Sequence, residues 1–183
     1  MEPAEKESAK KTQAEPPSAE KLKKASEHLH YEIWMFASMA QALPGAQQAV
    51  DAAQIRVNAF LEAFVIHARV LMDFMYDDKP WADDVVATNF FDTPEQWTDA
   101  RKPLEKLSEE LQKVNGRAGK EVAHLTFARQ EITAEMKTWQ YGKIAEELAA
   151  LFNDFLARVP KEHLGPLLLR SAEAVLITGK EEK

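Results

Sequence analysis

The sequence has no cysteine, which excludes disulfide bonds, thiolate metal sites and a cysteine nucleophile. It also has no glycine-rich phosphate-binding loop and no useful length of the apolar–polar alternation that is typical of a strand. No run of lysine and arginine is present, and the formal net charge is −7, so broad nonspecific binding to nucleic acid is not expected. This composition still allows a small basic pocket.

No stretch of the chain is apolar and uncharged over the length that a membrane span needs. The longest apolar stretch, residues 59–76, carries four ionisable side chains: Glu62, His67, Arg69 and Asp73. These groups would be costly in a bilayer core. The amino terminus is charged throughout and has no apolar segment of the kind found in signal peptides. We therefore expect a soluble, cytoplasmic protein with no membrane contact.

The segment from about Asp51 to Tyr76 gives the strongest helix prediction, because it lacks glycine and proline and is rich in Ala, Leu, Met and Phe. Its apolar residues fall on nearly every side, which is typical of a buried, central helix. At about 100° per residue, four polar side chains still lie within about 60° of one another. This polar stripe consists of Asn58, Glu62, Arg69 and Asp73. His67 points the opposite way, where a structural or interface role is expected.

Helical spacing of apolar residues continues along most of the chain. We predict a disordered tail over 1–19, a single all-α domain over 20–178 and a frayed end over 179–183. The predicted helices cover about 20–43, 51–76, 94–115 with a kink or restart at Pro103, 118–139, 143–158 and, as a shorter piece, 164–176. Pro44-Gly45 is expected to end the first helix, and Gly116 the third. The predicted fold is all-α, an up-and-down bundle of four main helices plus one or two short extra helices.

Residues that could take part in binding or catalysis gather at the start of the helix predicted from about residue 118. Arg117 precedes this helix, Lys120 falls in its first turn, and His124 follows between one and two turns in. A helix N-terminus has unpaired backbone N–H groups and a partial positive charge. Arg117 and Lys120 are therefore candidates to hold a phosphate there, and His124 is a candidate general acid or base.

An Arg-x6-His element that opens a late helix, in an all-α bundle with a polar stripe on an earlier long helix, resembles the HEPN family. These helical domains occur in many prokaryotic toxin and phage-abortive-infection ribonucleases. The phrase Lys-Glu-Val-Ala-His-Leu-Thr at 120–126 resembles the abortive-infection branch, and the resemblance covers about 20–158. It implies RNA cleavage by Arg117 and His124 without a metal or other cofactor, across a homodimer interface. Glu62, Arg69 or Asp73 would assist, and an antitoxin-like protein is an implied partner.

The same residues allow a non-catalytic interpretation. Arg69 and Asp73 are four residues apart, and Glu62 and Arg69 are seven apart on the same face, so they could form a buried ion-pair ladder. The chain would then be a helical module for dimerisation or interaction. The acidic composition favours this alternative, and so does Ala118, since the family usually has a polar residue directly after the arginine.

Four-helix bundles can hold di-iron centres built from Glu-x-x-His pairs on two helices, so the sequence raises the question of a metal site. Two such pairs occur, Glu27/His30 and Glu121/His124. The first lies in the early turns of the first helix, far from the expected centre of the bundle, so no metal site is predicted.

Two further patterns are interpreted as structural. A second Arg-x4-His match, from Arg158 to His163, spans Pro160 at an expected helix break and is discounted for that reason. The tryptophans have no basic residues interleaved with them, so they are expected in the core or at its rim rather than as base-stacking platforms. They are Trp34, Trp81, Trp97 and Trp139.

Overall fold

The computed structural model describes residues 17–47, 53–119 and 138–173. In these parts of the chain every regular element is a helix and no strand occurs, which confirms the all-α prediction. The long helices are α1 (Ala19–Gln47), α2 (Ala53–Tyr76) and α6 (Tyr141–Arg158). The shorter α-helices and the 3-10 turns, labelled η, are η1 (Ala87–Phe90), α3 (Glu95–Thr98), η2 (Leu104–Lys106), α4 (Glu109–Gln112), α5 (Val114–Arg117), η5 (Lys161–His163) and α7 (Pro166–Glu173).

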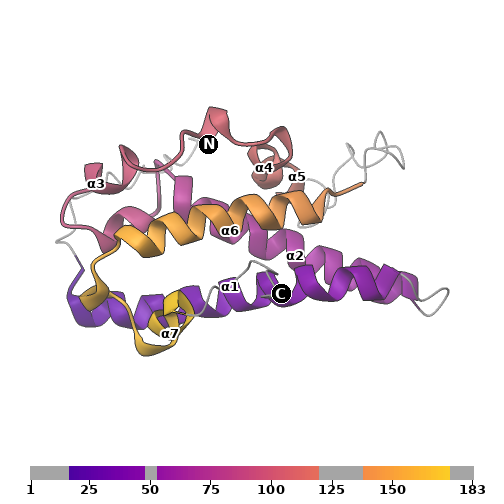
Figure 1. The fold of residues 1–183 in the computed structure, drawn as a ribbon. Helices are drawn as coiled ribbons and strands as arrows, with labels where there is room; N and C mark the ends of the chain where they lie inside the picture. Colours follow the sequence, from indigo (N-terminus) through magenta and orange to yellow (C-terminus); the bar gives the residue numbers. More distant parts are fainter. Residues whose placement is uncertain (1–16, 48–52, 120–137, 174–183) are drawn as a thin grey trace, which may run out of the picture.

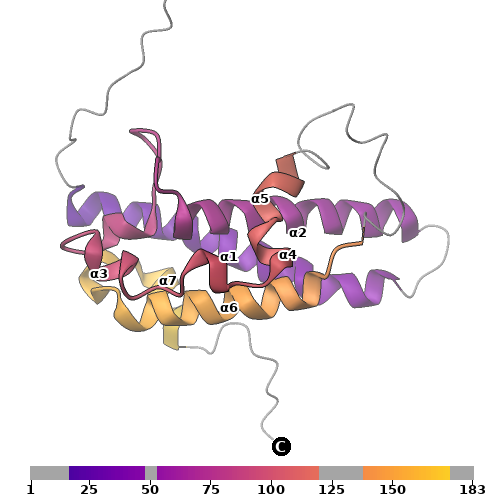
Figure 2. The same ribbon diagram turned by 90° about the horizontal axis from the view of Figure 1, so that it is seen from above.

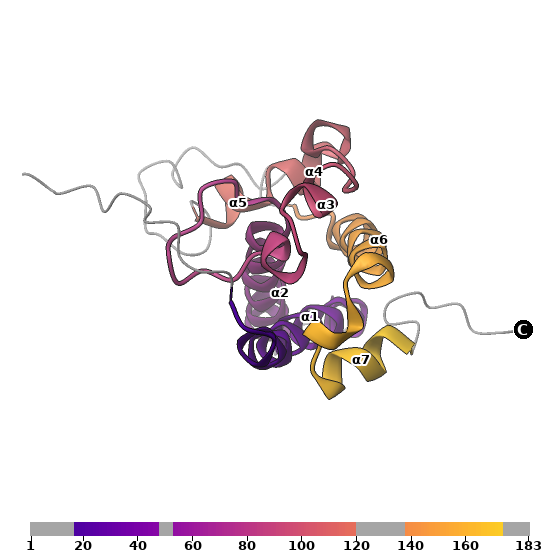
Figure 3. The ribbon, with the colours of Figure 1, turned by 90° about the vertical axis from the view of Figure 1, so that its left-hand side faces the viewer.

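The long helices α1, α2 and α6 extend along one common direction (Figures 1 and 2). Glu32 of α1 contacts His67 of α2, and Phe36 contacts Phe64, so the first two helices run antiparallel. Figure 3 shows the short helices α3, α4 and α5 on one side of the long ones and α7 on the opposite side, beside α1. None of the helices in the described residues combines the length and the apolar character that crossing a membrane requires.

Helix α2 is central to the core, as its composition predicts. Its buried side chains pack against α1 and α6 and are Phe64, Val65, Ala68, Leu71, Met72, Phe74 and Met75. Phe64 stacks on Phe36 of α1, with 4.7 Å between ring centroids. Burying each such side chain stabilises the fold by about 1.5–3 kcal/mol.

An aromatic cluster attaches the irregular segment after α2 to helix α6. Its centre is Phe155 of α6, which is fully buried. The surrounding rings, at centroid distances of 5.3–6.4 Å, are Phe74, Phe90, Phe91, Trp97 and Phe152. All five pairs are edge-to-face, a geometry that adds about 0.5–1.5 kcal/mol to area burial. Side chains from η1 and α3 are held to the long helices in this way.

The end of α1 differs from the expectation. The helix does not stop at Pro44-Gly45 but continues to Gln47, with Pro44 inside it. A proline near the carboxyl end of a helix removes one backbone hydrogen bond. Leu43 directly before it is completely buried, and this packing outweighs the lost hydrogen bond. The prediction that Pro44-Gly45 ends the first helix is therefore wrong.

The third predicted main helix, over 94–115, is also wrong. The chain there forms the separate short elements α3, η2, α4 and α5. Pro103 has no N–H to continue a helix, and Ser108 starts a new one by accepting the Leu111 N–H on its hydroxyl oxygen at 3.2 Å. Gly116 does not stop the chain's helical path either, because it lies inside α5.

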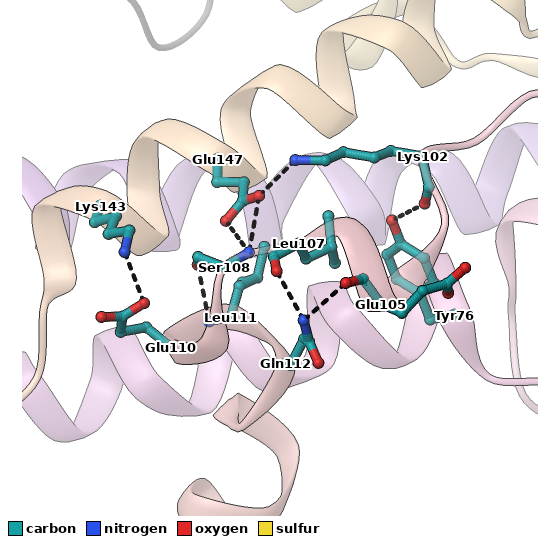
Figure 4. Close-up of polar contacts among 10 residues, drawn as sticks. All are labelled: Tyr76, Lys102, Glu105, Leu107, Ser108, Glu110, Leu111, Gln112, Lys143 and Glu147. Atoms are coloured by element: carbon teal, nitrogen blue, oxygen red, sulfur yellow. Dashed lines mark hydrogen bonds and ion pairs between the residues drawn. The ribbon is translucent and has the colours of Figure 1, made fainter.

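Polar contacts then fasten this broken segment to α2 and α6 (Figure 4). The Glu147 carboxylate of α6 accepts hydrogen bonds from the Ser108 N–H and from the Lys102 ammonium. A second contact is the ion pair of Lys143 with Glu110, at 2.8 Å. The Tyr76 hydroxyl at the end of α2 donates to the Lys102 carbonyl at 2.7 Å.

The last two predicted helices are present with shifted ends. Helix α6 begins at Tyr141 rather than 143, and α7 begins at Pro166 rather than 164. The helix predicted over 118–139 lies almost entirely outside the described residues, as do positions 1–16 and 174–183.

The start of α7 is bound to α1. The Gly165 N–H donates to the hydroxyl of Ser26, which is completely buried, at 2.7 Å. The Leu167 N–H donates to the Glu27 carboxylate at 3.3 Å, and an acidic group at a helix N-terminus is favourable. A Cβ at position 165 would lie 1.8 Å from that carboxylate, so glycine allows this close approach.

Candidate functional site

The polar stripe of α2 is partly engaged and partly open to solvent. Arg69 Nε lies 3.6 Å from Asp73 Oδ2, the i, i+4 pair expected from the sequence. These side chains are 38% and 46% exposed, so the prediction of a buried ladder is wrong for this pair. Glu62 is exposed, and within the described residues no ion pair joins it to Arg69.

A long-range hydrogen bond connects this stripe to α5. Asn115 Nδ2 donates to Asp73 Oδ1 at 2.5 Å. Burial raises the pKa of the Asp73 carboxyl above its ordinary value, opposed by the nearby Arg69 cation and reinforced by the negative charge of Asp77. Asp73 therefore has the kind of perturbed acidity that is often found at functional sites.

The other amide atom of Asn115 is an unused acceptor. Its Oδ1 is buried, and the described part of the chain supplies no donor to it. Leaving such an atom unpaired costs about 1–3 kcal/mol, so the position favours any donor that can reach it. No local sequence pattern distinguishes Asn115 from the other residues around Arg117, because the partner of Asn115 is 42 positions away.

Arg117 is the last residue of α5, two positions after Asn115. Its guanidinium carbon lies 3.9 Å from the centre of the ring of Trp139, two positions before α6, and this is a cation–π contact. The next residue, Ala118, is completely buried. Lys120 and His124, the other members of the expected phosphate-binding and catalytic set, lie outside the described residues.

A groove of about 850 Å³ lies between α1, α2 and the segment 81–86. Arg69 and Asp73 line it, whereas Arg117 and Asn115 do not. The remaining lining residues come mostly from two walls and are Lys21, Lys24, Ala25, His28, Leu29, Glu32, Val70, Phe74, Asp77, Trp81, Asp84, Val85 and Val86. The sequence does not predict this groove. The one feature of the sequence that points to it is the apolar content of the irregular segment 81–86, which follows a helix.

The other histidines of interest have structural partners. His67 Nδ1 donates to Glu32 of α1 at 2.5 Å, and this pair is mostly buried, in line with the structural role expected for His67. His163 Nδ1 donates to the Phe90 carbonyl at 2.8 Å, while Arg158 pairs with Asp154. Both residues of the second Arg-x4-His match therefore have partners within the fold.

The metal hypothesis gains no support from the described positions. No group of three or more His, Asp or Glu residues is placed there to hold a metal ion. Glu27, from one of the Glu-x-x-His pairs, instead accepts the Leu167 N–H at the start of α7. Glu121 and His124, the other pair, lie outside the described residues.

Comparison of the chain with protein-family models, with curated proteins and with solved structures found no match. A function can therefore be argued only from the residues and contacts described above.

Proposed function

We propose that this chain is a HEPN-like helical protein that cleaves RNA without a metal ion, as a toxin or phage-defence endoribonuclease. The observation that carries the proposal is the hydrogen bond between Asn115 and Asp73. It joins the polar stripe of α2 to α5, where the Arg117-x6-His124 element begins. A polar group from an earlier long helix beside such an element is the arrangement that the resemblance implies.

The roles follow from the chemistry of RNA cleavage. The ribose 2′-oxygen attacks the adjacent phosphorus, the bond to the 5′-oxygen breaks, and a 2′,3′-cyclic phosphate and a 5′-hydroxyl result. His124 would take the 2′-hydroxyl proton or supply one to the leaving oxygen. Arg117 and Lys120 would hold the phosphate and stabilise its growing negative charge. Asp73, Arg69 and Glu62 are the assisting residues on α2.

The proposal includes the other expectations of the resemblance. Residues 118–139 would supply a further main helix and complete the up-and-down bundle around α1, α2 and α6. The active form would be a cytoplasmic homodimer, with RNA as substrate and an antitoxin-like protein as a natural partner.

The test is cleavage of total RNA with EDTA present, by the unmodified protein and by His124→Ala and Arg117→Ala variants. We expect cleavage by the unmodified protein and a loss of at least about a hundredfold in either variant, the range typical of a lost general acid or base for His124 and of a lost charge-stabilising donor for Arg117. Arg158→Ala is the matched control, because within the described part of the chain that arginine pairs with Asp154 at the surface. Intact RNA after incubation with folded unmodified protein, or equal activity in the His124 variant, would reject the proposal.

A second candidate function is a non-catalytic interaction module. The observation that favours it is that both arginines of the candidate set already have protein partners: Arg69 pairs with Asp73, and Arg117 lies over Trp139. In that case the stripe stabilises the fold, and no variant or unmodified protein cleaves RNA.

A further inference from the structure

The groove between α1, α2 and the segment 81–86 exposes apolar side chains that the core does not use. Val70 and Val85 are 41% and 43% exposed, and Trp81 is 78% exposed. All three line the groove, whose floor includes Leu29 and Phe74. Exposed apolar side chains that gather in one groove are typical of a surface that binds a ligand or another protein.

The two walls of this groove carry opposite charges. The α1 wall presents Lys21 and Lys24, while the wall formed by α2 and the following segment presents Asp77 and Asp84. Among the described residues, the ion-pair partner of Lys24 is Glu20, and both side chains are largely exposed. Such an exposed pair is worth little, so this wall remains basic.

The acidic wall keeps its charge as well. Asp77 accepts the backbone N–H of Lys79 at 2.8 Å, and Asp84 accepts that of Trp81 at 2.6 Å. These local hydrogen bonds fix the direction of both carboxylates without neutralising them. At the end of the groove near Glu32 the charges of the two walls are reversed, because Glu32 lies on the α1 wall and Arg69 on the α2 wall. Both are paired within the chain, Arg69 with Asp73 and Glu32 with His67.

The spacing of these charged residues along the groove matches the spacing of side chains along a helix lying in it. On α1 the groove residues Lys21, Lys24 and His28 follow one another at three and four positions, and on α2 Asp73 and Asp77 are four apart. Side chains at this spacing form a row along a helix with one residue per turn, and a third helix laid alongside presents rows with the same repeat. The groove extends from Lys21 to Glu32, about 16 Å or three turns of helix.

We propose that this groove docks an amphipathic helix of another protein, with acidic residues along the flank that faces α1 and basic residues along the flank that faces Asp77 and Asp84. The apolar stripe of the partner contacts Val70, Val85 and Trp81, the mode in which helices bind hydrophobic grooves. A nucleic-acid strand fits less well, because its phosphates would face the aspartate wall. The inference does not depend on RNA cleavage by the chain.

The test uses three synthetic helical peptides that share one leucine and alanine stripe and differ in their flanks. The first has Glu on one flank and Lys on the other, the second has Lys on both, and the third has Glu on both. Binding to the full chain is measured by titration calorimetry. We expect the mixed peptide to bind at least tenfold more tightly than either uniform peptide.

Variants of the chain show whether the peptide occupies this groove. Val70→Asp and Val85→Asp are expected to weaken binding at least tenfold. The matched control is Leu167→Asp on α7, because Leu167 is 45% exposed and does not line the groove. Asp77→Asn with Asp84→Asn, which keeps the acceptors of the backbone hydrogen bonds, should shift the preference to the all-Glu peptide. Lys21→Glu with Lys24→Glu should shift it to the all-Lys peptide.

Other occupants give different results, and each would overturn the proposal. Equal binding of all three peptides, or binding that the Val70 and Val85 variants leave unchanged, removes the groove as the site. Self-association that Val85→Asp abolishes would assign the groove to a second copy of the chain. Displacement of the peptide by single-stranded RNA would assign it to nucleic acid, and tighter peptide binding after removal of residues 1–16 would assign it to the chain's own amino-terminal segment.

Discussion

One carboxylate, that of Glu147 on α6, holds the irregular segment between α3 and α4. Both of its oxygens accept the Ser108 N–H, at 3.1 and 3.0 Å, and one accepts the Lys102 ammonium at 2.8 Å. Burial pushes the pKa of Glu147 upward, but the hydrogen bonds from Lys102 and Ser108 outweigh it and hold that pKa below its ordinary value. The folded state therefore favours the charged carboxylate.

Replacing this carboxylate by an amide gives a pH-dependent test. Glu147→Gln should lower the free energy of unfolding at pH 7 by about 1.5–3 kcal/mol, the usual worth of hydrogen bonds to a charged group. Because the folded-state pKa lies below the ordinary 4.5, this stabilisation is complete well above pH 4.5 and is lost as the pH falls through the folded-state pKa. Urea unfolding between pH 7 and pH 3 should show the two proteins converging in acid.

A control separates this carboxylate from other acids nearby. Glu109→Gln removes a charge that is paired with Lys113 at the surface, where the carboxylate is 76% exposed, and should change the unfolding free energy little. A constant gap between Glu147→Gln and the unmodified protein at every pH would contradict the role given to its charge.

At the scale of single contacts, sequence spacing identifies partners on the same helix and misses those between helices. The spacing predicts the pair between Arg69 and Asp73, because side chains four positions apart on a helix lie close together. Asn115 and Asp73 are 42 positions apart, and His67 and Glu32 are 35 apart. Their hydrogen bonds depend on how the helices pack, which no local spacing encodes.

At the scale of elements, apolar periodicity predicts the long helices but does not predict where they end. Pro44 and Gly116 were both expected to be stops, yet each lies inside a helix. The burial of Leu43 and Val114 beside them explains this, because packing against other helices outweighs a local preference. The opposite error occurred over 94–115, where prolines and a capping serine divide an apolar pattern into short turns.

The end of α1 can be tested with one substitution. Pro44→Ala restores the missing N–H and removes the ring from the helix, and a helix-interior proline is about 3 kcal/mol less favourable than alanine. Some of this gain is offset because proline also restricts the unfolded chain, so we expect a net stabilisation of about 1–2 kcal/mol. Urea unfolding measures it, and a loss of stability would indicate that the helix ends before Pro44.

At the scale of the whole molecule, the aromatic cluster around Phe155 joins segments that are far apart in the sequence. It brings together side chains of α2, η1, α3 and α6. Folded domains are stable by only about 5–15 kcal/mol, so one residue in contact with all four segments accounts for a large share of that margin.

Removing the central ring should therefore affect cooperative unfolding. Phe155→Ala is expected to lower the free energy of unfolding by about 3–5 kcal/mol, and Phe155→Leu by less, because it leaves a smaller cavity. Circular dichroism during urea unfolding measures both variants. Trp81→Ala serves as the control, because that side chain is 78% exposed. A loss below about 1 kcal/mol in Phe155→Ala would show that the cluster relaxes around the cavity.

The contact between the start of α7 and α1 has a consequence for the order of events during translation. Ser26 is made early, yet the Gly165 N–H that bonds to its buried hydroxyl is made 139 residues later. A contact of such long sequence separation must wait for loop closure over most of the chain. Helix α1 thus leaves the ribosome well before α7, and the part of its packing that depends on α7 is completed late.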